Sequence, residues 1–183
     1  MKKIFILLIS AMVVFSACNS NSSNSKQHDF FDVDFGMPFD EVLKMKGEPD
    51  RQSDDPKWSY CFYNNQEMLG MSHVTLSYQA DKNGIVICGA NFFGNSDGDF
   101  DDDASYQSGY NSLKEILISE WGEPIQLIEN DTDFKYFCSW GNKFLKLHKR
   151  EIEGDILVTL SINAYRPDYL EENAWVTEDF ATE

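Results

Sequence analysis

The sequence is short of basic residues and of histidine. Among 183 residues, 15 Lys and Arg stand against 31 Asp and Glu, which gives a formal net charge of −16, and only three residues are His. Such a chain repels anionic phosphates, which excludes the basic surface of a nucleic-acid-binding protein. The sequence also lacks Gly-x-Ser-x-Gly, His-Glu-x-x-His and phosphate-binding glycine loops. We therefore expect no catalytic residues, no cofactor and no nucleic-acid partner.

Long hydrophobic runs are scarce as well. One apolar stretch, Ile4–Phe15, stands at the N-terminus, so a protein with several membrane spans is excluded. It is shorter than the roughly 20 apolar residues that a transmembrane helix needs, and it follows Lys2 and Lys3, as in a secretory signal peptide. Apolar residues still make up 42% of the chain and aromatic residues 14%. That share supports a packed core and excludes a globally disordered chain.

The four residues Phe15-Ser16-Ala17-Cys18 resemble a bacterial lipobox. The resemblance implies that residues 1–17 are a lipoprotein signal peptide and that Cys18 carries the acyl chains, palmitate among them. Two or more chains give stable membrane anchoring. The alternative is an ordinary signal peptide cut after Ala17, with Cys18 an unmodified thiol.

The residues after Cys18 are polar. Asn19–Gln27 contains no apolar side chain, so we expect residues 18–29 to form a flexible tether. In the enterobacterial pattern an Asp after the cysteine retains a lipoprotein at the inner membrane, whereas here Asn19 stands there. The resemblance therefore favours a lipid-anchored protein of the cell envelope, on the outer membrane facing the periplasm.

A short tripeptide occurs twice, as Gly47-Glu48-Pro49 and as Gly122-Glu123-Pro124. Apolar residues at helical spacing precede each copy, which predicts short amphipathic helices over 39–46 and 113–121. Ser112 suits the N-cap of the second helix. Each helix is expected to stop at its Gly, because Gly tolerates the left-handed conformation and the following Pro cannot continue a helix.

Alternating aromatic residues follow each tripeptide and predict strands. Asn83-Gly84 predicts a tight hairpin, and Gly154 marks a corresponding turn in the second copy. A chance recurrence of the tripeptide is the alternative, but the same order of helix, breaker and hairpin favours duplication. The predicted fold is α+β, with two tandem helix-plus-antiparallel-sheet units. The expected parts after the signal peptide and tether are a first unit, an acidic linker, a second unit and an acidic C-terminal tail, over residues 30–94, 95–110, 111–166 and 167–183.

The run Phe35-Gly36-Met37-Pro38, followed by Gly47-Glu48-Pro49, resembles the SmpA/OmlA-type (BamE-like) lipoproteins, a family that includes the small lipoprotein of the outer-membrane β-barrel assembly machinery. The tandem organisation is similar to the β-lactamase-inhibitor-protein (BLIP-like) fold. The resemblance covers roughly residues 30 to 165 and implies a lipoprotein with a sheet that binds other proteins. The second copy departs from it, because Tyr110-Asn111-Ser112 stands where Gly-Met-Pro is expected.

The segment Asp97–Asp103 is strongly acidic. Hard cations favour several carboxylates, but an EF-hand register starting at Asp97 puts Asp102 where Gly is required and Ser108 where Glu is required. We therefore expect a solvated linker and no metal site.

Three cysteines remain after Cys18, namely Cys61, Cys88 and Cys138. One disulfide with one free thiol is allowed in an oxidising compartment. All three fall in predicted strands, where free cysteine behaves as a small apolar residue, so we expect buried thiols.

Aromatic residues occur on both faces of the predicted strands. Helices can cover one face of the sheet, so Tyr63, Phe137 or their neighbours are expected to line an exposed surface, and Trp140 is a third candidate. The predicted function is that of a lipid-anchored, non-enzymatic protein-interaction or assembly module. Its partners are the membrane, through Cys18, and an unidentified protein. The alternatives are an inhibitor or ligand-binding module using an aromatic sheet surface, and, more remotely, a hydrolase with an assembled Cys-His or carboxylate site.

Overall fold

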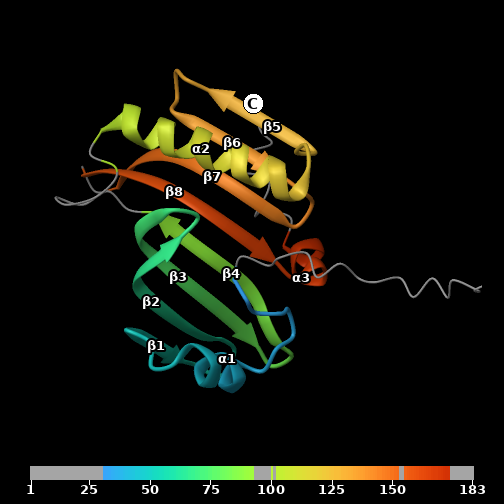
Figure 1. Ribbon diagram of the computed structural model, residues 1–183. Coiled ribbons are helices and arrows are strands. Elements are labelled where there is room, and N and C mark those ends of the chain that lie inside the picture. The colour runs from blue at the N-terminus through green and yellow to red at the C-terminus, as the bar shows by residue number, and fades with distance from the viewer. Residues whose placement is uncertain (1–30, 93–99, 101, 153–154, 174–183) are drawn as a thin grey trace, which may run out of the picture.

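The computed structural model describes residues 31–92, 100, 102–152 and 155–173 (Figure 1). Its centre is one eight-stranded antiparallel sheet with the strand order β1-β2-β3-β4-β8-β7-β6-β5. The elements in chain order are α1 (Phe39–Lys46), β1 (Arg51–Asp54), β2 (Ser59–Met68), β3 (Met71–Asp81), β4 (Gly84–Phe92), α2 (Asp103–Trp121), β5 (Gln126–Asn130), β6 (Lys135–Ser139), β7 (Lys143–Ile152), β8 (Asp155–Tyr165) and α3 (Pro167–Glu172).

The prediction of two tandem helix-plus-sheet units is wrong. Strands β4 and β8 pair in antiparallel register from Ile87↔Tyr165 to Phe92↔Leu160, which joins all eight strands into one open sheet with small helices. Buried residues of both halves also form one apolar cluster. The reason is that the last strand of each predicted unit hydrogen-bonds to the other, and hydrophobic alternation within a strand does not reveal which strands pair.

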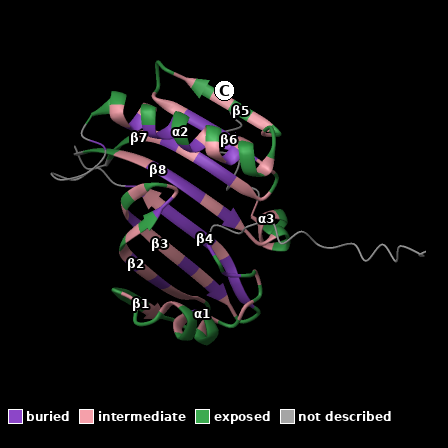
Figure 2. Cartoon of the chain, viewed as in Figure 1, coloured by how far each residue is buried: buried purple, intermediate pink, exposed green. Residues whose placement is uncertain are grey.

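The sheet has two unlike faces. Side chains of successive strand residues point to opposite faces, and directly paired residues share a face. One face carries most of the buried apolar residues and packs against α1 and α2; we call it the helix face. Figure 2 shows these buried residues along the strands, with the outer sides of the helices exposed. We call the opposite face the open face.

On the helix face, β1–β4 are covered by α1 and by residues 31–38. Phe31, Val33 and Val42 are buried there, and the Tyr78 hydroxyl donates a hydrogen bond to the Phe31 carbonyl at 3.1 Å. The predicted helix over 39–46 is confirmed. Gly36 N–H donates to the Ile85 carbonyl at 2.9 Å, so the Gly-Met segment lies directly against the hairpin turn between β3 and β4.

On the same face, β5–β8 are covered by α2. This helix begins at Asp103 and includes residues 103–110, which were predicted as part of the acidic linker. The predicted N-cap at Ser112 is therefore wrong. Asp102 caps the helix: its carboxylate accepts from the Ser105 N–H at 2.7 Å, and Ser105 Oγ accepts from the Asp102 N–H in return, a capping box.

Helices α1 and α2 end at the predicted glycines, Gly47 and Gly122, whose N–H groups donate to the carbonyls of Leu43 and Ile118. The expected left-handed conformation is wrong: φ is +88° and +80°, but ψ is −164° and −169°, an extended conformation with positive φ that is essentially restricted to glycine. The hairpin at Asn83-Gly84 is confirmed, with Asp81 paired to Gly84. Among the described residues, no helix is both long and apolar enough to cross a bilayer.

The three described cysteines are buried free thiols, as expected from their positions in strands. Burial raises the pKa of the Cys61 thiol to about 11 and raises that of Cys138 as well. Both sulfurs therefore stay protonated at neutral pH and serve as apolar filling of the helix face.

Candidate functional site: the open face of the sheet

The open face is the part of the sheet best suited to contact another molecule. Of the helices that the structure describes, only the short α3 packs against it, over one end. Its strand positions follow from the pairing registers. In sheet order, the open-face positions of β1, β2, β3 and β4 are Arg51, Ser53; Tyr60, Phe62, Asn64; Thr75, Ser77, Gln79; and Ile87, Gly89, Asn91. Those of β8, β7, β6 and β5 are Asp155, Leu157, Thr159, Ser161, Asn163, Tyr165; Phe144, Lys146, His148, Arg150, Ile152; Lys135, Phe137, Ser139; and Gln126, Ile128, Asn130.

Aromatic side chains line the β2 part of this face. Tyr60 and Phe62 are partly exposed, and their rings meet edge to face with centroids 6.0 Å apart. With Gln79 and Ile87 they line a hollow of about 290 Å³. The lining combines aromatic residues with the polar residues Ser77 and Gln79, a composition that suits an apolar side chain with a polar end.

Small polar residues occupy the centre of the face. A Cβ placed on Gly89 would lie 2.6 Å from Ser77 Oγ and 2.9 Å from Asn163 Oδ1, so these two side chains fill the space above β4. Asn163 Nδ2 donates to Ser161 Oγ at 3.0 Å. The absence of a side chain at Gly89 thus leaves room above β4 for a hydroxyl group from β3 and an amide group from β8.

Basic residues occupy the β6–β7 part. Lys135, Lys146, His148 and Arg150 share the open face there, and we call them the basic patch. Lys146 Nζ lies 5.4 Å from the ring centroid of Phe144 and 5.9 Å from that of Phe137. These cation–π contacts hold the ammonium group over the two buried rings.

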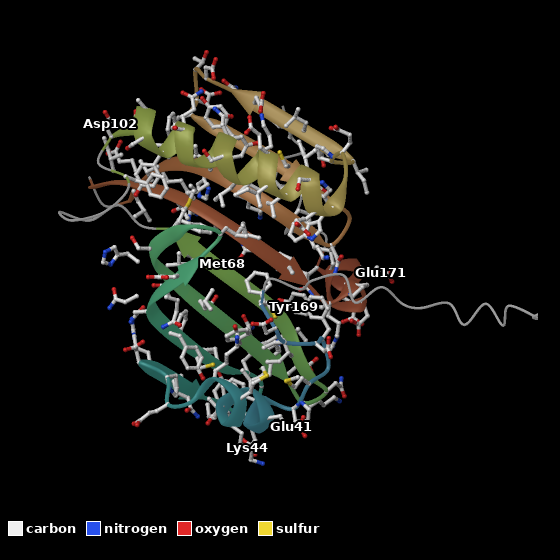
Figure 3. The ribbon with its side chains drawn as sticks, viewed as in Figure 1. Glu41, Lys44, Met68, Asp102, Tyr169 and Glu171 are labelled. Atoms are coloured by element: carbon white, nitrogen blue, oxygen red, sulfur yellow. The ribbon has the colours of Figure 1, made fainter. Side chains whose placement is uncertain are left out.

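Helix α3 covers the end of the open face where β8 ends, and Figure 3 labels Tyr169 on it. Tyr169 stacks on Tyr165 with centroids 6.4 Å apart and meets Trp58 edge to face at 5.8 Å. Burial raises the pKa of Tyr165 to about 12. A cavity of about 490 Å³ opens beside these rings, lined also by Lys57, Lys82, Glu172 and Asn173.

An ion pair ties α3 to the hairpin between β3 and β4. The two terminal nitrogens of Arg166 donate to the two carboxylate oxygens of Asp81 at 2.9 and 3.3 Å, and Arg166 Nε donates to Asp168 at 2.7 Å. The hydrogen bond to Asp81 raises the pKa of Arg166 further above its ordinary value. These hydrogen bonds fix the start of α3 to the β3–β4 hairpin at this end of the open face.

Two of the predicted aromatic site residues are not exposed. Tyr63 lies on the helix face, is 6% exposed and donates its hydroxyl to the Gly47 carbonyl at 3.0 Å. Phe137 lies on the open face but is fully buried beside Phe144, with Leu170 of α3 packed against that pair. The expectation of exposure is wrong for both residues, and their neighbours Tyr60 and Phe62 are the ones that reach the surface.

Trp140, the third candidate, is partly exposed but belongs to the opposite side. Its indole N–H donates to the Gly122 carbonyl at 2.7 Å, and its ring meets Trp121 edge to face at 5.4 Å. It packs against the helix-face cluster and braces the end of α2. The predicted lipidation residue Cys18, the signal peptide and the tether lie outside the described residues.

The sheet itself separates the groups that a Cys-His dyad would need. Cys138 points to the helix face and hydrogen-bonds with the Tyr110 hydroxyl at 3.0 Å, whereas His148 points to the open face. Within residues 31–92, 100, 102–152 and 155–173, no three His, Cys, Asp or Glu side chains gather as metal ligands. Most of the acidic run 97–103 lies outside this range.

The open-face residues that sequence reasoning did not name are Tyr60 and the basic patch, and Phe62 was expected only as a neighbour of Tyr63. The signal for the patch was present, because Lys146, His148 and Arg150 alternate along one predicted strand. The sequence did not reveal which face of the strands the helices cover. That choice determines whether Tyr63 or its neighbour Phe62 is accessible to a partner.

No family model matches the chain, and no curated protein matches it. A cysteine-rich secretory protein from Staphylococcus aureus subsp. aureus Mu50 aligns with 74% of this chain at 10% identity and a TM-score of 0.36, and the alignment spans 44% of that protein. A DUF4309 family protein from Bacillus subtilis subsp. subtilis str. 168 aligns with 69% of this chain and 78% of its own at 14% identity and a TM-score of 0.34. Similarities this weak carry no statement about function.

Proposed function

We propose that this protein is a non-enzymatic, lipid-anchored module of the bacterial cell envelope that binds another protein through the open face of its sheet. The observation that carries the proposal is the asymmetry of the sheet. One face is sealed by α1, α2 and residues 31–38, while the other presents partly exposed Tyr60 and Phe62 beside polar groups and a hollow of about 290 Å³.

Partly exposed aromatic residues on a rigid sheet are suitable binding anchors. Tyrosine and phenylalanine bury a large area on association and lose little side-chain entropy, and aromatic residues are enriched at protein interfaces. The strands beneath them are held in register on both sides, so the face is preorganised and a partner does not have to order it.

The lipobox supplies the cellular context of the proposal. An acylated Cys18 followed by the polar tether 18–29 would hold the sheet near a membrane and leave it free to meet a partner. The prediction is tested by growing cells with labelled palmitate. The wild type should incorporate the label and a Cys18→Ala variant should not; label retained in the variant would exclude lipidation at Cys18.

The binding face is tested by photocrosslinking in the native cell. A photoreactive phenylalanine analogue replaces Tyr60 or Phe62 in the full chain, and Lys44 on the exposed side of α1 serves as the matched control. We expect both open-face positions to capture the same protein and Lys44 not to capture it. Capture from Lys44 alone, or from no position, would contradict the proposed face.

The hollow beside Tyr60 keeps one alternative open. A site lined by Tyr60, Phe62, Gln79 and Ile87 could also receive a side chain of an inhibited enzyme. The same experiment separates the two functions. If the captured protein is an enzyme whose activity falls when the purified chain is added, the module is an inhibitor, and if its activity is unchanged, the module is an assembly factor.

A further inference from the structure

We propose that the outer edge of strand β5 binds an extended segment of another protein as a ninth strand, and that this segment is apolar at alternate positions and basic at its ends. The proposal goes beyond the proposed function, because it concerns the edge of the sheet and not its open face. It is carried by the position of β5 at the end of the sheet, by an apolar row that reaches this edge uncovered, and by the charge around the strand.

Strand β5 is the last strand of the sheet, and Figure 1 shows it at the outer border of the second half. Among the described residues it pairs only with β6, from Gln126↔Ser139 to Asn130↔Lys135. In an antiparallel pair, alternate residues direct their N–H and C=O groups to the neighbouring strand, and the residues between them direct theirs away from it. The outer edge of β5 therefore presents backbone donors and acceptors with the spacing that another strand requires.

One row of side chains across the helix face ends at this edge. Pairing places Leu127 of β5 beside Cys138, Cys138 beside Leu145, and Leu145 beside Ile162. The three inner residues are fully buried, whereas Leu127 is 51% exposed, and Ile125, directly before the strand, is 80% exposed. The apolar row therefore reaches the edge without being covered there. An added strand with an apolar residue beside Leu127 would continue the row and cover it.

The opposite edge of the sheet is built differently. Gln52 of β1 is the equivalent residue, because it also lies on the helix face of an edge strand and is also paired with a cysteine, Cys61. Its amide donates to Asp54 at 3.1 Å, so polar and charged groups occupy this edge and discourage pairing with another chain. Strand β5 has one charged residue, Glu129, and Lys114 of α2 pairs with it. The β5 edge therefore lacks the protection that β1 has.

The charge around β5 selects the kind of segment that fits. Residues 119–134 contain five acidic residues and no Lys or Arg. Four of the five are exposed and flank the strand, two at each end, namely Glu120, Glu123, Asp131 and Asp133. The basic residues nearest in the fold are Lys143, over the ring of Trp121 at the first end, and Lys135, in register with Asn130 at the second. Each end thus has two carboxylates and one ammonium group, and it attracts a basic residue.

The same charges argue against a second copy of this chain as the occupant. Two antiparallel β5 strands related by a two-fold axis would place the Glu123 end of one strand beside the Asp131 end of the other. Like charges would then meet at both ends, which destabilises a strand pair. A segment with Lys or Arg at both ends meets opposite charges instead. The occupant is therefore a segment of another protein.

The test measures binding of short fluorescent peptides to the purified full chain by fluorescence anisotropy at low salt. The parent peptide has valine at alternate positions, threonine between them and lysine at both ends. Further peptides carry N-methyl groups on alternate backbone nitrogens, along one edge, along the other edge, or along both. A segment that adds to β5 pairs through one edge only. At least one single-edge peptide should therefore bind within about twofold of the parent, whereas methylation of both edges should weaken binding more than about tenfold, because no edge keeps its donors.

The variant Leu127→Lys tests the place of binding. It puts a charge on the outer edge of β5 and removes the apolar surface that the segment would cover, so it should weaken binding of the parent peptide about tenfold. The matched control is Gln52→Lys, which introduces the same side chain and the same change of net charge at the opposite edge, and it should change the affinity less than about twofold.

A second pair of variants tests the charge. Glu123→Lys, at an exposed position before β5, should weaken binding of the parent peptide about threefold. Glu41→Lys changes the net charge by the same amount on α1, which Figure 3 shows at the end of the molecule away from β5, and the affinity should stay nearly unchanged. A parent peptide with glutamate in place of its lysines should bind more weakly than the lysine peptide.

Several results would overturn the proposal. Binding that survives methylation of both edges would show that backbone pairing is not used, and an equal loss in Leu127→Lys and Gln52→Lys would show an effect of net charge alone. A wild-type dimer in sedimentation velocity that Leu127→Lys dissociates would make a second copy the occupant. Tighter peptide binding after removal of residues 174–183 would make the chain's own end the occupant.

Misfolding and failure of the proposed function can both be recognised. Leu127 is half exposed, so Leu127→Lys should keep the melting temperature of the wild type, and the methylated peptides test the same proposal without any substitution in the chain. Crosslinks from Tyr60 and Phe62 report on the open face. Loss of peptide binding at the edge with these crosslinks intact overturns the edge proposal alone, and absence of the crosslinks with peptide binding intact overturns the proposed function alone.

Discussion

The two halves of the sheet, β1–β4 and β5–β8, are covered and equipped differently. On the helix face, the first half is closed by the eight-residue helix α1 together with residues 31–38, and the second half by the 19-residue helix α2. On the open face, the first half presents a neutral aromatic hollow and the second half the basic patch. The halves are therefore alike in strand count and turn placement but not in chemistry.

This difference separates stability from recognition. The helix faces of both halves share one apolar cluster. The segments that cover the two halves can therefore differ, provided that the buried apolar surface stays continuous. The open faces have no such constraint, and each half carries its own set of side chains. We infer that substitutions on the helix face act on the whole molecule, whereas substitutions on the open face act locally.

The largest effect is expected from the core beneath α2. Leu117→Ala removes a fully buried side chain and should lower the free energy of unfolding by about 4 kcal/mol, whereas Val42→Ala in α1 should cost about 2 kcal/mol because less volume is lost. Urea denaturation followed by circular dichroism measures both values.

The same variant tests whether the halves unfold together. In Leu117→Ala, hydrogen exchange should accelerate equally for the globally protected amides of β3 and β7, because β4 and β8 join the halves through a continuous ladder. Faster exchange confined to β7 would show that the second half unfolds by itself, so that the two halves would be independent folding units.

The next effect concerns glycines at turns. Gly84 has φ of +98°, and a Cβ there would lie 2.3 Å from the Gly36 carbonyl oxygen, so Gly84→Ala combines strain with a backbone clash and should cost about 3 kcal/mol. Gly47 in the first half and Gly122 in the second have similar φ values and open space around them. Their Ala variants should each cost about 2 kcal/mol, from backbone strain alone, because ψ values of −164° and −169° place both residues in a region that is essentially restricted to glycine.

These three variants are compared by their urea midpoints. Similar losses for Gly47→Ala and Gly122→Ala would show that the two helix ends are energetically equivalent despite the different helices. A Gly84→Ala variant as stable as Gly47→Ala would mean that residues 31–38 are not held against the hairpin, and that α1 covers the first half without their help.

Much of the local structure could be predicted from the sequence, because its causes are local. The helix over 39–46, the glycine stops at Gly47 and Gly122, the hairpin at Asn83-Gly84 and the burial of the cysteines all follow from spacing, turn chemistry and residue type. The first turns of α2 were missed because the acidic run 97–103 was interpreted as a solvated linker and Ser112 as the N-cap. Within those turns, Gly109 makes room for Phe100: a Cβ there would lie 2.1 Å from the Phe100 ring.

The pairing of β4 with β8 and the identity of the open face could not be predicted, because both depend on contacts between distant segments. Alternation correctly separated each strand into two faces. It did not show that the face with Tyr63 meets α1 while the face with Phe62 stays accessible. Phe137 lies on the open face by its pairing, but Leu170 of α3 packs against its cluster. Leu170 is four residues past the end of the predicted second unit, in the segment that was predicted as an acidic tail.

The smallest effect is a pH dependence at the ion pair between Asp81 of the first half and Arg166, which follows β8 of the second half. Burial opposes the ionisation of Asp81, but hydrogen bonds from Arg166 and the Asn83 N–H outweigh it, so the pKa lies below the ordinary value of 3.8. A carboxyl whose pKa is lower in the folded state stabilises the fold above the unfolded pKa, and this contribution is lost as the pH falls through the folded pKa. As the pH is lowered from about 5 to about 3, the urea concentration at the wild-type unfolding midpoint should therefore decrease, and Asp81→Asn should make that decrease smaller.

The control is Asp34→Asn, which removes an equal charge from an exposed position and should leave the slope unchanged. If both variants flatten the decline equally, general charge repulsion explains it, and the Asp81–Arg166 pair contributes little to the pH dependence of stability.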